Sequence, residues 1–156
     1  MNLSELLRPD HVDHCTHISS KKRALEHISE LLAKDAGRLG WNEIFDSLIN
    51  REKLGSTSLG KGVALPHGRM EALEYPVCAF LKLDEPVDFD SSDGKPVDLL
   101  FALLVPEEST EEHLQILSVI AELFSNPVFC SSIRECDSDA CLYRLLTQQE
   151  PQQISA

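Results

Sequence analysis

One stretch restricts the fold of this chain more than any other: the apolar run from Val97 to Val105. Every residue in it except Asp98 is apolar, so the run lacks the alternation of a strand with one solvated face. It therefore predicts a strand covered on both faces. The run ends at Pro106 and is far shorter than the roughly 20 residues that span a bilayer. A strand of this kind requires helices packed on its sheet, which predicts an α/β fold.

Helical patterns flank this strand on both sides. Capping residues and apolar spacing predict helices from Ser20 to about Ala36, from Asn42 to Leu54, from Ser109 to Phe124, from Pro127 onward and from Ser138 onward. Val77 to Leu83 is expected to form another strand, residues 1–18 an irregular segment or a short edge strand, and residues 55–68 a series of turns. The length suits one domain, which we place at residues 1–150, followed by a flexible tail at 151–156.

The charge of the chain restricts its partners. Its 26 acidic residues against 14 basic ones give a formal net charge of -12. Such a surface repels phosphate backbones and anionic lipids, so the sequence predicts neither nucleic-acid binding nor direct membrane insertion. It suits docking to a basic patch on a partner protein.

The cysteines and the N-terminus bear on the cellular compartment. The five cysteines are odd in number and include no CxxC pair, and the first residues lack the basic start and apolar run of a signal peptide. These features predict a cytoplasmic protein with reduced thiols. Cys130, Cys136 and Cys141 fall in helical segments, where small core or near-surface residues are expected.

His67 is the leading candidate for chemistry. It stands between Pro66 and Gly68, after a stretch rich in Gly, Ser and Thr. A histidine that carries a phosphoryl group must be neutral, reachable and close to hydrogen-bond donors. Ser56 and Thr57 offer hydroxyls and backbone N–H groups for binding, and Gly68 would let a partner surface come close. A turn histidine without a role would show the same pattern, so spacing alone leaves both open.

Two further residues are candidates for the same site. Ser109 and Glu112 form a capping box that places His113 in the first helical turn, where the helix dipole keeps an imidazole neutral and attracts anions. His113 would then face His67 and donate to a phosphoryl oxygen. Arg51, near a helix end, would add positive charge. The alternatives are a solvated helix-start histidine and an arginine bound to the helix C-terminus.

Two other clusters carry weaker signals. His11, His14, Cys15 and His17 match no structural zinc spacing, and strand alternation would separate His14 from Cys15. The sequence therefore predicts no metal site and calls for no cofactor, although a zinc protein remains an alternative. The basic triple from Lys21 to Arg23 is expected to be a solvated face, with a docking handle as the other possibility.

The motif around His67 resembles that of a known family. The segments Asn50–Thr57 and Gly62–Gly68 are similar to the active-site signature of fructose/mannitol-type enzyme IIA proteins of the bacterial phosphotransferase system. The stretch Pro96–Pro106, the pair His113-Leu114 and the segment Ser20–Leu25 add to the resemblance, which runs from about residue 3 to 147. Within the superfamily, the chain is most similar to the nitrogen-regulatory branch.

The resemblance implies a fold and a function. It implies one domain with a central mixed sheet and helices on both faces. It implies that His67 accepts a phosphoryl group on Nε2 from a histidine phosphocarrier protein, that His113 stabilises this group and that Arg51 is the active-site arginine. The protein would then regulate partners, such as potassium-uptake systems or sensor kinases, according to its phosphorylation state. The alternatives are a sugar-transport component that passes phosphate to an enzyme IIB and a binding module that is never phosphorylated.

Overall fold

The structure, a computed structural model, describes residues 3–15, 17–108 and 110–148. Its strands are β1 (Val12–Cys15), β2 (Ser58–Gly60), β3 (Val63–Ala64), β4 (His67–Met70), β5 (Val77–Val87) and β6 (Val97–Pro106). Its helices are α1 (Lys21–Ala33), α2 (Trp41–Lys53), α3 (Thr110–Phe124), α4 (Pro127–Glu135) and α5 (Asp139–Thr147), with 3-10 turns η1 (Leu3–Glu5) and η2 (Pro9–His11).

The strands form one mixed sheet in the order β1-β5-β6-β3-β2, and β4 pairs with β6 beyond the end of β3. β5 and β6 are antiparallel, whereas β1 pairs with β5, and both β3 and β4 pair with β6, in parallel. The predicted α/β class with a mixed central sheet is confirmed. The short edge strand expected near the N-terminus is β1.

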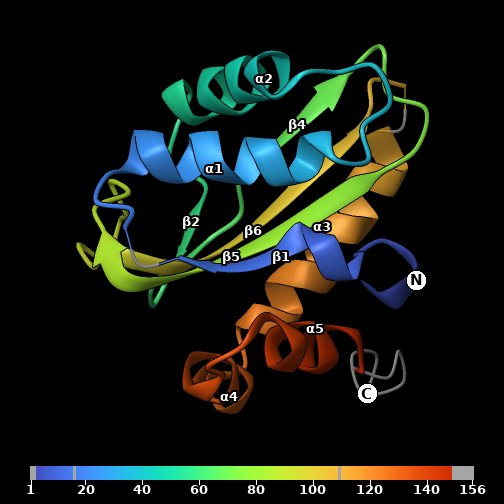
Figure 1. Ribbon diagram of the computed structural model, residues 1–156. Coiled ribbons are helices and arrows are strands. Elements are labelled where there is room, and N and C mark those ends of the chain that lie inside the picture. The colour runs from blue at the N-terminus through green and yellow to red at the C-terminus, as the bar shows by residue number, and fades with distance from the viewer. Residues whose placement is uncertain (1–2, 16, 109, 149–156) are drawn as a thin grey trace.

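Two apolar clusters cover the two faces of this sheet. α1 and α2 pack on one face, and α3, α4 and α5 on the other (Figure 1). β6 supplies both clusters by alternation: Leu100, Ala102 and Leu104 face α1 and α2, while Phe101 and Leu103 face α3. The strand that the apolar run predicted is therefore covered on both faces, as expected.

Several boundaries differ from the predicted ones. α1 begins after its cap Ser20 as expected but ends at Ala33, three residues early. Asn42 does not cap α2: the N-cap is Gly40, whose N–H donates to the Glu43 carboxylate at 3.3 Å. α4 begins at Pro127 as predicted, with Asn126 as its cap, and α5 begins after its predicted cap Ser138. The predicted cap of α3, Ser109, and the whole predicted tail at 151–156 lie outside the described residues.

The stretch expected to be turns contains three strands. β2, β3 and β4 are two to four residues long, too short for a periodic signal of their own. They form because the backbone N–H and C=O groups of β6 and β3 are available to pair with theirs. The prediction for residues 55–68 is therefore wrong at the point that carries His67.

The expectation that all cysteines are reduced is also wrong. Cys136 and Cys141 form a disulfide with their Cα atoms 5.6 Å apart. The two lie at the end of α4 and in the first turn of α5, so the tight connection between the helices brings them together. Cys15, Cys78 and Cys130 are free thiols.

No described helix taken singly is long and apolar enough to cross a membrane. Residues 111–124 and 127–135 meet such a criterion only as a pair, bent by 78° between them.

Candidate active site between α2 and α3

His67 is the first residue of β4, which follows a gap between β3 and β4 in the pairing along β6. β3 pairs with Leu99 and Leu100 of β6, and β4 resumes the pairing with His67 opposite Leu103. Pro66, which has no N–H, lies in the gap, and its carbonyl accepts from the Leu103 N–H at 3.0 Å. Since Leu103 faces α3, the side chain of His67 lies on that face too.

The hydrogen bond of the His67 ring decides its tautomer. Nδ1 lies 2.7 Å from the backbone carbonyl oxygen of Leu65. Because a carbonyl oxygen can only accept, Nδ1 carries the proton and Nε2 keeps its lone pair. Burial lowers the pKa of His67 and the Arg51 charge adds to this, while the Leu65 bond and Glu52 act in the opposite sense. The net result is a neutral ring at pH 7.

His113 lies across from His67 in the first turn of α3. The two rings meet edge-on, with centroids 5.3 Å apart and planes inclined at 77°. Nε2 of His113 is buried and has no hydrogen-bond partner among the described residues. Burial lowers the pKa of His113, and the nearby His67, Arg69 and Arg51 lower it further. The site thus contains a second neutral imidazole with an unsatisfied polar atom, which is costly unless a ligand satisfies it.

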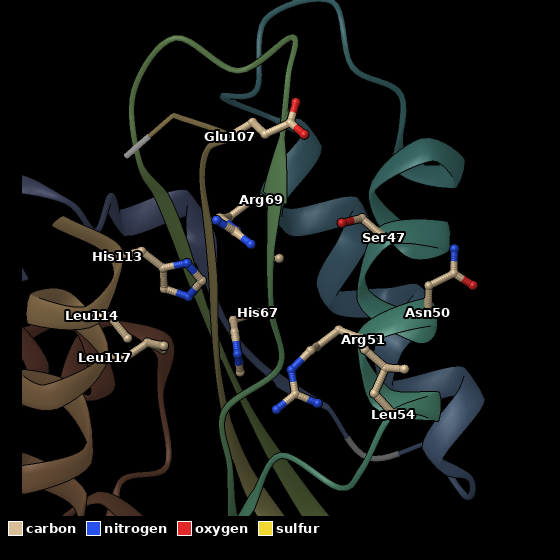
Figure 2. Close-up of a pocket in the computed structure, with 11 residues that line it drawn as sticks. Ser47, Asn50, Arg51, Leu54, His67, Arg69, Glu107, His113, Leu114 and Leu117 are labelled. Atoms are coloured by element: carbon tan, nitrogen blue, oxygen red, sulfur yellow. The ribbon is translucent and has the colours of Figure 1, made fainter. Parts of the chain in front are cut away.

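Arg51 combines both roles that its sequence position suggested. Its Nη1 donates to the Gly55 carbonyl oxygen at 3.0 Å, just beyond the end of α2. Figure 2 shows the guanidinium on the side of α2 that faces His67. Its charge lowers the pKa of both histidines, so it acts on the site electrostatically as well as closing the helix end.

The other three predicted site residues lie close by, but each makes contacts within the protein that we did not expect. The Ser56 hydroxyl donates to the Phe89 carbonyl oxygen at 2.8 Å, and the Thr57 hydroxyl donates to Glu52 at 2.6 Å. Gly68 faces α2: a Cβ there would lie 2.5 Å from Ser47 Oγ. Its missing side chain makes room for a helix, whereas we expected it to make room for a partner.

The site includes residues that the sequence analysis missed. A cavity of about 550 Å³ extends from His67 past Ser47, Asn50, Arg69 and Glu107. Arg69 stands two residues after His67 on the same face of β4, and Figure 2 shows it beside His113. This alternation would have indicated Arg69, but only if β4 had been predicted as a strand.

Exposed leucines surround the mouth of this cavity. Leu54 at the end of α2 is 84% exposed, and Leu114 next to His113 is 64% exposed. Both line the cavity together with the half-buried Leu117. Apolar side chains left in water around a polar centre are typical of a protein-docking surface.

The other clusters noted in the sequence lie away from this cavity. His11 is buried with its ring nitrogen 3.0 Å from the Cys78 carbonyl oxygen, and His14 pairs with Asp84. Within the described ranges, no group of three or more His, Cys, Asp or Glu side chains is arranged to hold a metal ion. Of the basic triple, Lys22 and Arg23 are exposed as expected, whereas Nζ of Lys21 lies 3.1 Å from the buried carboxylate of Glu52.

The assembled chemistry is that of an anion site with a nucleophile. His67 Nε2 has a lone pair, and His113 Nε2 has no partner within the part of the chain that the structure describes. Both residues line the same cavity, together with two arginines. Neutral imidazoles beside arginines suit a tetrahedral oxyanion that is bound and attacked at its centre.

Known proteins resemble this chain over most of its length. The family model for the phosphoenolpyruvate-dependent sugar phosphotransferase system, EIIA 2, matches residues 5–149. A nitrogen regulatory protein from Klebsiella oxytoca is 43% identical, covering 95% of this chain and 91% of the relative. The nitrogen regulatory protein of Escherichia coli (strain K12) is 42% identical, covering 96% and 92%.

A solved structure extends the agreement to the fold. The crystal structure of nitrogen regulatory protein IIA-Ntr from Neisseria meningitidis has a TM-score of 0.86 and 42% identity, and the match covers 93% of this chain and 99% of that one. The chain therefore belongs to the EIIA 2 family of the phosphoenolpyruvate-dependent sugar phosphotransferase system, and it is similar over nearly its whole length to nitrogen regulatory proteins.

Proposed function

We propose that this protein accepts a phosphoryl group on Nε2 of His67 from a histidine phosphocarrier protein and regulates partner proteins according to its phosphorylation state. The observation that carries the proposal is the Nδ1–H bond from His67 to the Leu65 carbonyl, which leaves Nε2 as the nucleophilic nitrogen. Membership of the EIIA 2 family supports a role in phosphoryl transfer.

The transfer is an exchange between two imidazoles. Nε2 of His67 attacks phosphorus in line, and the bond between phosphorus and the donor's ring nitrogen breaks as the new bond forms. The departing nitrogen keeps the electron pair. The proton stays on Nδ1 of His67, hydrogen-bonded to the Leu65 carbonyl oxygen throughout, so His67 needs no base to make Nε2 a nucleophile.

The surrounding groups stabilise the charge on the phosphoryl oxygens. In this proposal His113 carries its proton on Nε2 and donates it to one oxygen, which satisfies the atom that lacks a partner in the described structure. Arg51 and Arg69 add positive charge from opposite sides of the cavity. Because these groups are held by a strand and two helices, they need little rearrangement during transfer.

The rim of the cavity supports a protein as the donor. A small phosphorylated metabolite would bind inside the cavity and leave Leu54 and Leu114 in water. A phosphocarrier that places its phosphohistidine over His67 would cover them. After transfer, the phosphoryl group adds about two negative charges to a chain that already carries -12, which can release an acidic partner or recruit a basic one.

Labelling with a phosphorylated histidine phosphocarrier tests the proposal. We expect the wild-type protein to take up acid-labile phosphate and the His67→Ala variant to take up none. His14→Ala serves as the matched control, because His14 lies on β1 and pairs with Asp84 outside the cavity. Labelling of His67→Ala at the wild-type level would refute the assignment.

A further inference from the structure

A buried polar cluster lies beneath the loop that joins α2 to β2. The side chain of Glu52 is only 2% exposed, and its carboxylate accepts two hydrogen bonds and forms one ion pair. Thr57 donates its backbone N–H at 3.0 Å and its hydroxyl at 2.6 Å, and the Lys21 ammonium lies 3.1 Å from the same carboxylate. We call these three residues the Glu52 cluster. A buried carboxylate is tolerated only when it is paired and hydrogen-bonded in this way.

Hydrogen bonds lead from this cluster directly to the nucleophile. The carbonyl oxygen of Thr57 accepts from the Leu65 N–H at 3.0 Å. The carbonyl oxygen of Leu65 in turn accepts from Nδ1–H of His67 at 2.7 Å. The N–H and the carbonyl of Leu65 belong to two different peptide groups, so the two hydrogen bonds do not polarise a common amide. Their effect is to fix the position of the His67 ring. The Glu52 cluster therefore supports the bond that decides which nitrogen of His67 is free.

The same cluster also supports Arg51. Arg51 precedes Glu52 in the last turn of α2, and its guanidinium donates to the Gly55 carbonyl oxygen at 3.0 Å. Gly55 lies in the short loop whose far end is tied to Glu52 through Thr57. A movement of that loop would shift the acceptor of Arg51 and the Thr57 carbonyl together.

We infer that Glu52 is a positioning residue for phosphoryl transfer, which aligns His67 and Arg51 through Thr57 and the loop after α2. This inference rests on the proposed function, because it assigns Glu52 to the alignment of groups that act there. Glu52 is too deeply buried to touch a partner protein. Lys21 has a matching role: it balances the buried charge, which accounts for a lysine in the first turn of α1, where the helix dipole disfavours it.

The titratable and charged groups around His67 determine how the transfer rate should depend on pH. They are Arg51 and Glu52 from α2, Arg69 on β4 and Glu107 just after β6, and the neutral but titratable His113 of α3 lies beside them. The Glu52 carboxylate raises the pKa of His67, while burial and Arg51 lower it. Removing the Glu52 charge therefore lowers this pKa further, so the acid side of a rate profile should move to lower pH.

The Glu52→Gln variant tests the inference by kinetics. It keeps the size of the side chain and removes its charge. With a phosphorylated histidine phosphocarrier as donor, we expect the transfer rate at saturating donor to fall between about 10-fold and 100-fold. The donor concentration for half-maximal rate should not change, because no contact with the donor is lost. Glu26→Gln is the matched control, because it removes an exposed ion pair with Arg23 on α1 and should change neither quantity.

A spectroscopic measurement separates positioning from general destabilisation. In ¹⁵N spectra of the His67 ring, the wild type should show the Nδ1–H tautomer, and Glu52→Gln should show a mixture of both tautomers. Thermal unfolding of the variant should remain cooperative. A wild-type rate, a change confined to half-saturation, or an unchanged tautomer in Glu52→Gln would each overturn the inference.

Thr57→Val provides a second variant, which also serves if Glu52→Gln does not fold. It removes the hydroxyl bond to Glu52 and keeps the side-chain volume, so we expect a slower rate at saturation with unchanged half-saturation. In the double variant the two losses should not multiply, because both act through the same contact between Glu52 and Thr57. Losses that do multiply would indicate a direct role for the Thr57 hydroxyl and contradict the inference. Failure of the proposed function is distinguishable, because then either the wild type would take up no phosphate or His67→Ala would still be labelled.

Discussion

The ring of His113 meets the ring of His67 edge-on, with centroids 5.3 Å apart, and its buried Nε2 has no partner among the described residues. A buried polar atom in this state costs stability without a ligand and gains a bond when an oxyanion arrives. His113→Ala should therefore leave the fold intact and slow phosphoryl transfer by roughly 100-fold, the usual loss for one oxyanion donor.

Initial rates from a phosphorylated histidine phosphocarrier measure this effect. His113→Gln is the control, because its amide can still donate to a phosphoryl oxygen and should recover part of the rate. Transfer by His113→Ala at the wild-type rate would show that this side chain does not contact the phosphoryl group.

The lowered pKa values of His67 and His113 predict a pH dependence of stability. Burial lowers the pKa of both His67 and His113 below the ordinary value of 6.5. Between that value and the folded-state pKa values, the unfolded chain binds more protons than the folded one. The stability that depends on these two rings being neutral is therefore fully present above pH 6.5. It is lost, as a lower free energy of unfolding, when pH falls through the folded-state pKa values.

Urea unfolding at about pH 7.5 and about pH 5.5 tests this sign. The wild type should lose more free energy of unfolding on acidification than a His67→Ala/His113→Ala double variant. Equal losses in the two proteins would mean that other groups account for the effect.

Gly68 predicts a packing effect with a specific rescue. A Cβ at this position would lie 2.5 Å from Ser47 Oγ of α2, so Gly68→Ala should lower the free energy of unfolding by about 1–3 kcal/mol. Adding Ser47→Ala removes the clashing oxygen and leaves an ordinary 3.6 Å approach to Cβ, so most of the loss should be recovered. Chemical denaturation of the single and double variants measures the loss and its recovery. A double variant no more stable than Gly68→Ala would refute this contact.

The disulfide between Cys136 and Cys141 predicts a redox effect on stability. It closes a loop of sequence separation 5, for which loop entropy gives about 2 kcal/mol. Reductant should lower the unfolding midpoint of the wild type and leave a Cys136→Ser/Cys141→Ser variant unchanged. An unfolding midpoint of the wild type that does not respond to reductant would show that the bond contributes no stability.

The elements that could be predicted from sequence are those whose signal is local. The apolar run of β6 and the spacing of Leu25, Ile28 and Leu32 in α1 indicate buried faces without knowledge of the rest of the chain. The caps Ser20 and Ser138 are equally local, since each side chain accepts from an N–H three residues away. Gly40 and Asn42 are both acceptable caps, and only the Glu43 contact distinguishes them.

What escaped prediction depends on contacts distant in sequence. β4 exists because His67 to Met70 line up with β6, and without that strand neither the α2-facing role of Gly68 nor the site-facing role of Arg69 is evident. Glu52 has the appearance of an ordinary polar residue in a last helical turn. Its burial follows from Lys21, which lies 31 residues earlier and on another helix.

The most direct test of the central claim is to find which ring nitrogen of His67 carries phosphorus. NMR of ¹⁵N-histidine-labelled protein, phosphorylated by a histidine phosphocarrier, resolves the phosphorus–nitrogen coupling for each ring position. The hydrogen bond from Nδ1 to the Leu65 carbonyl predicts phosphorus on Nε2 of His67, with the proton retained on Nδ1. Phosphorus on Nδ1, or on any other histidine, would contradict the account.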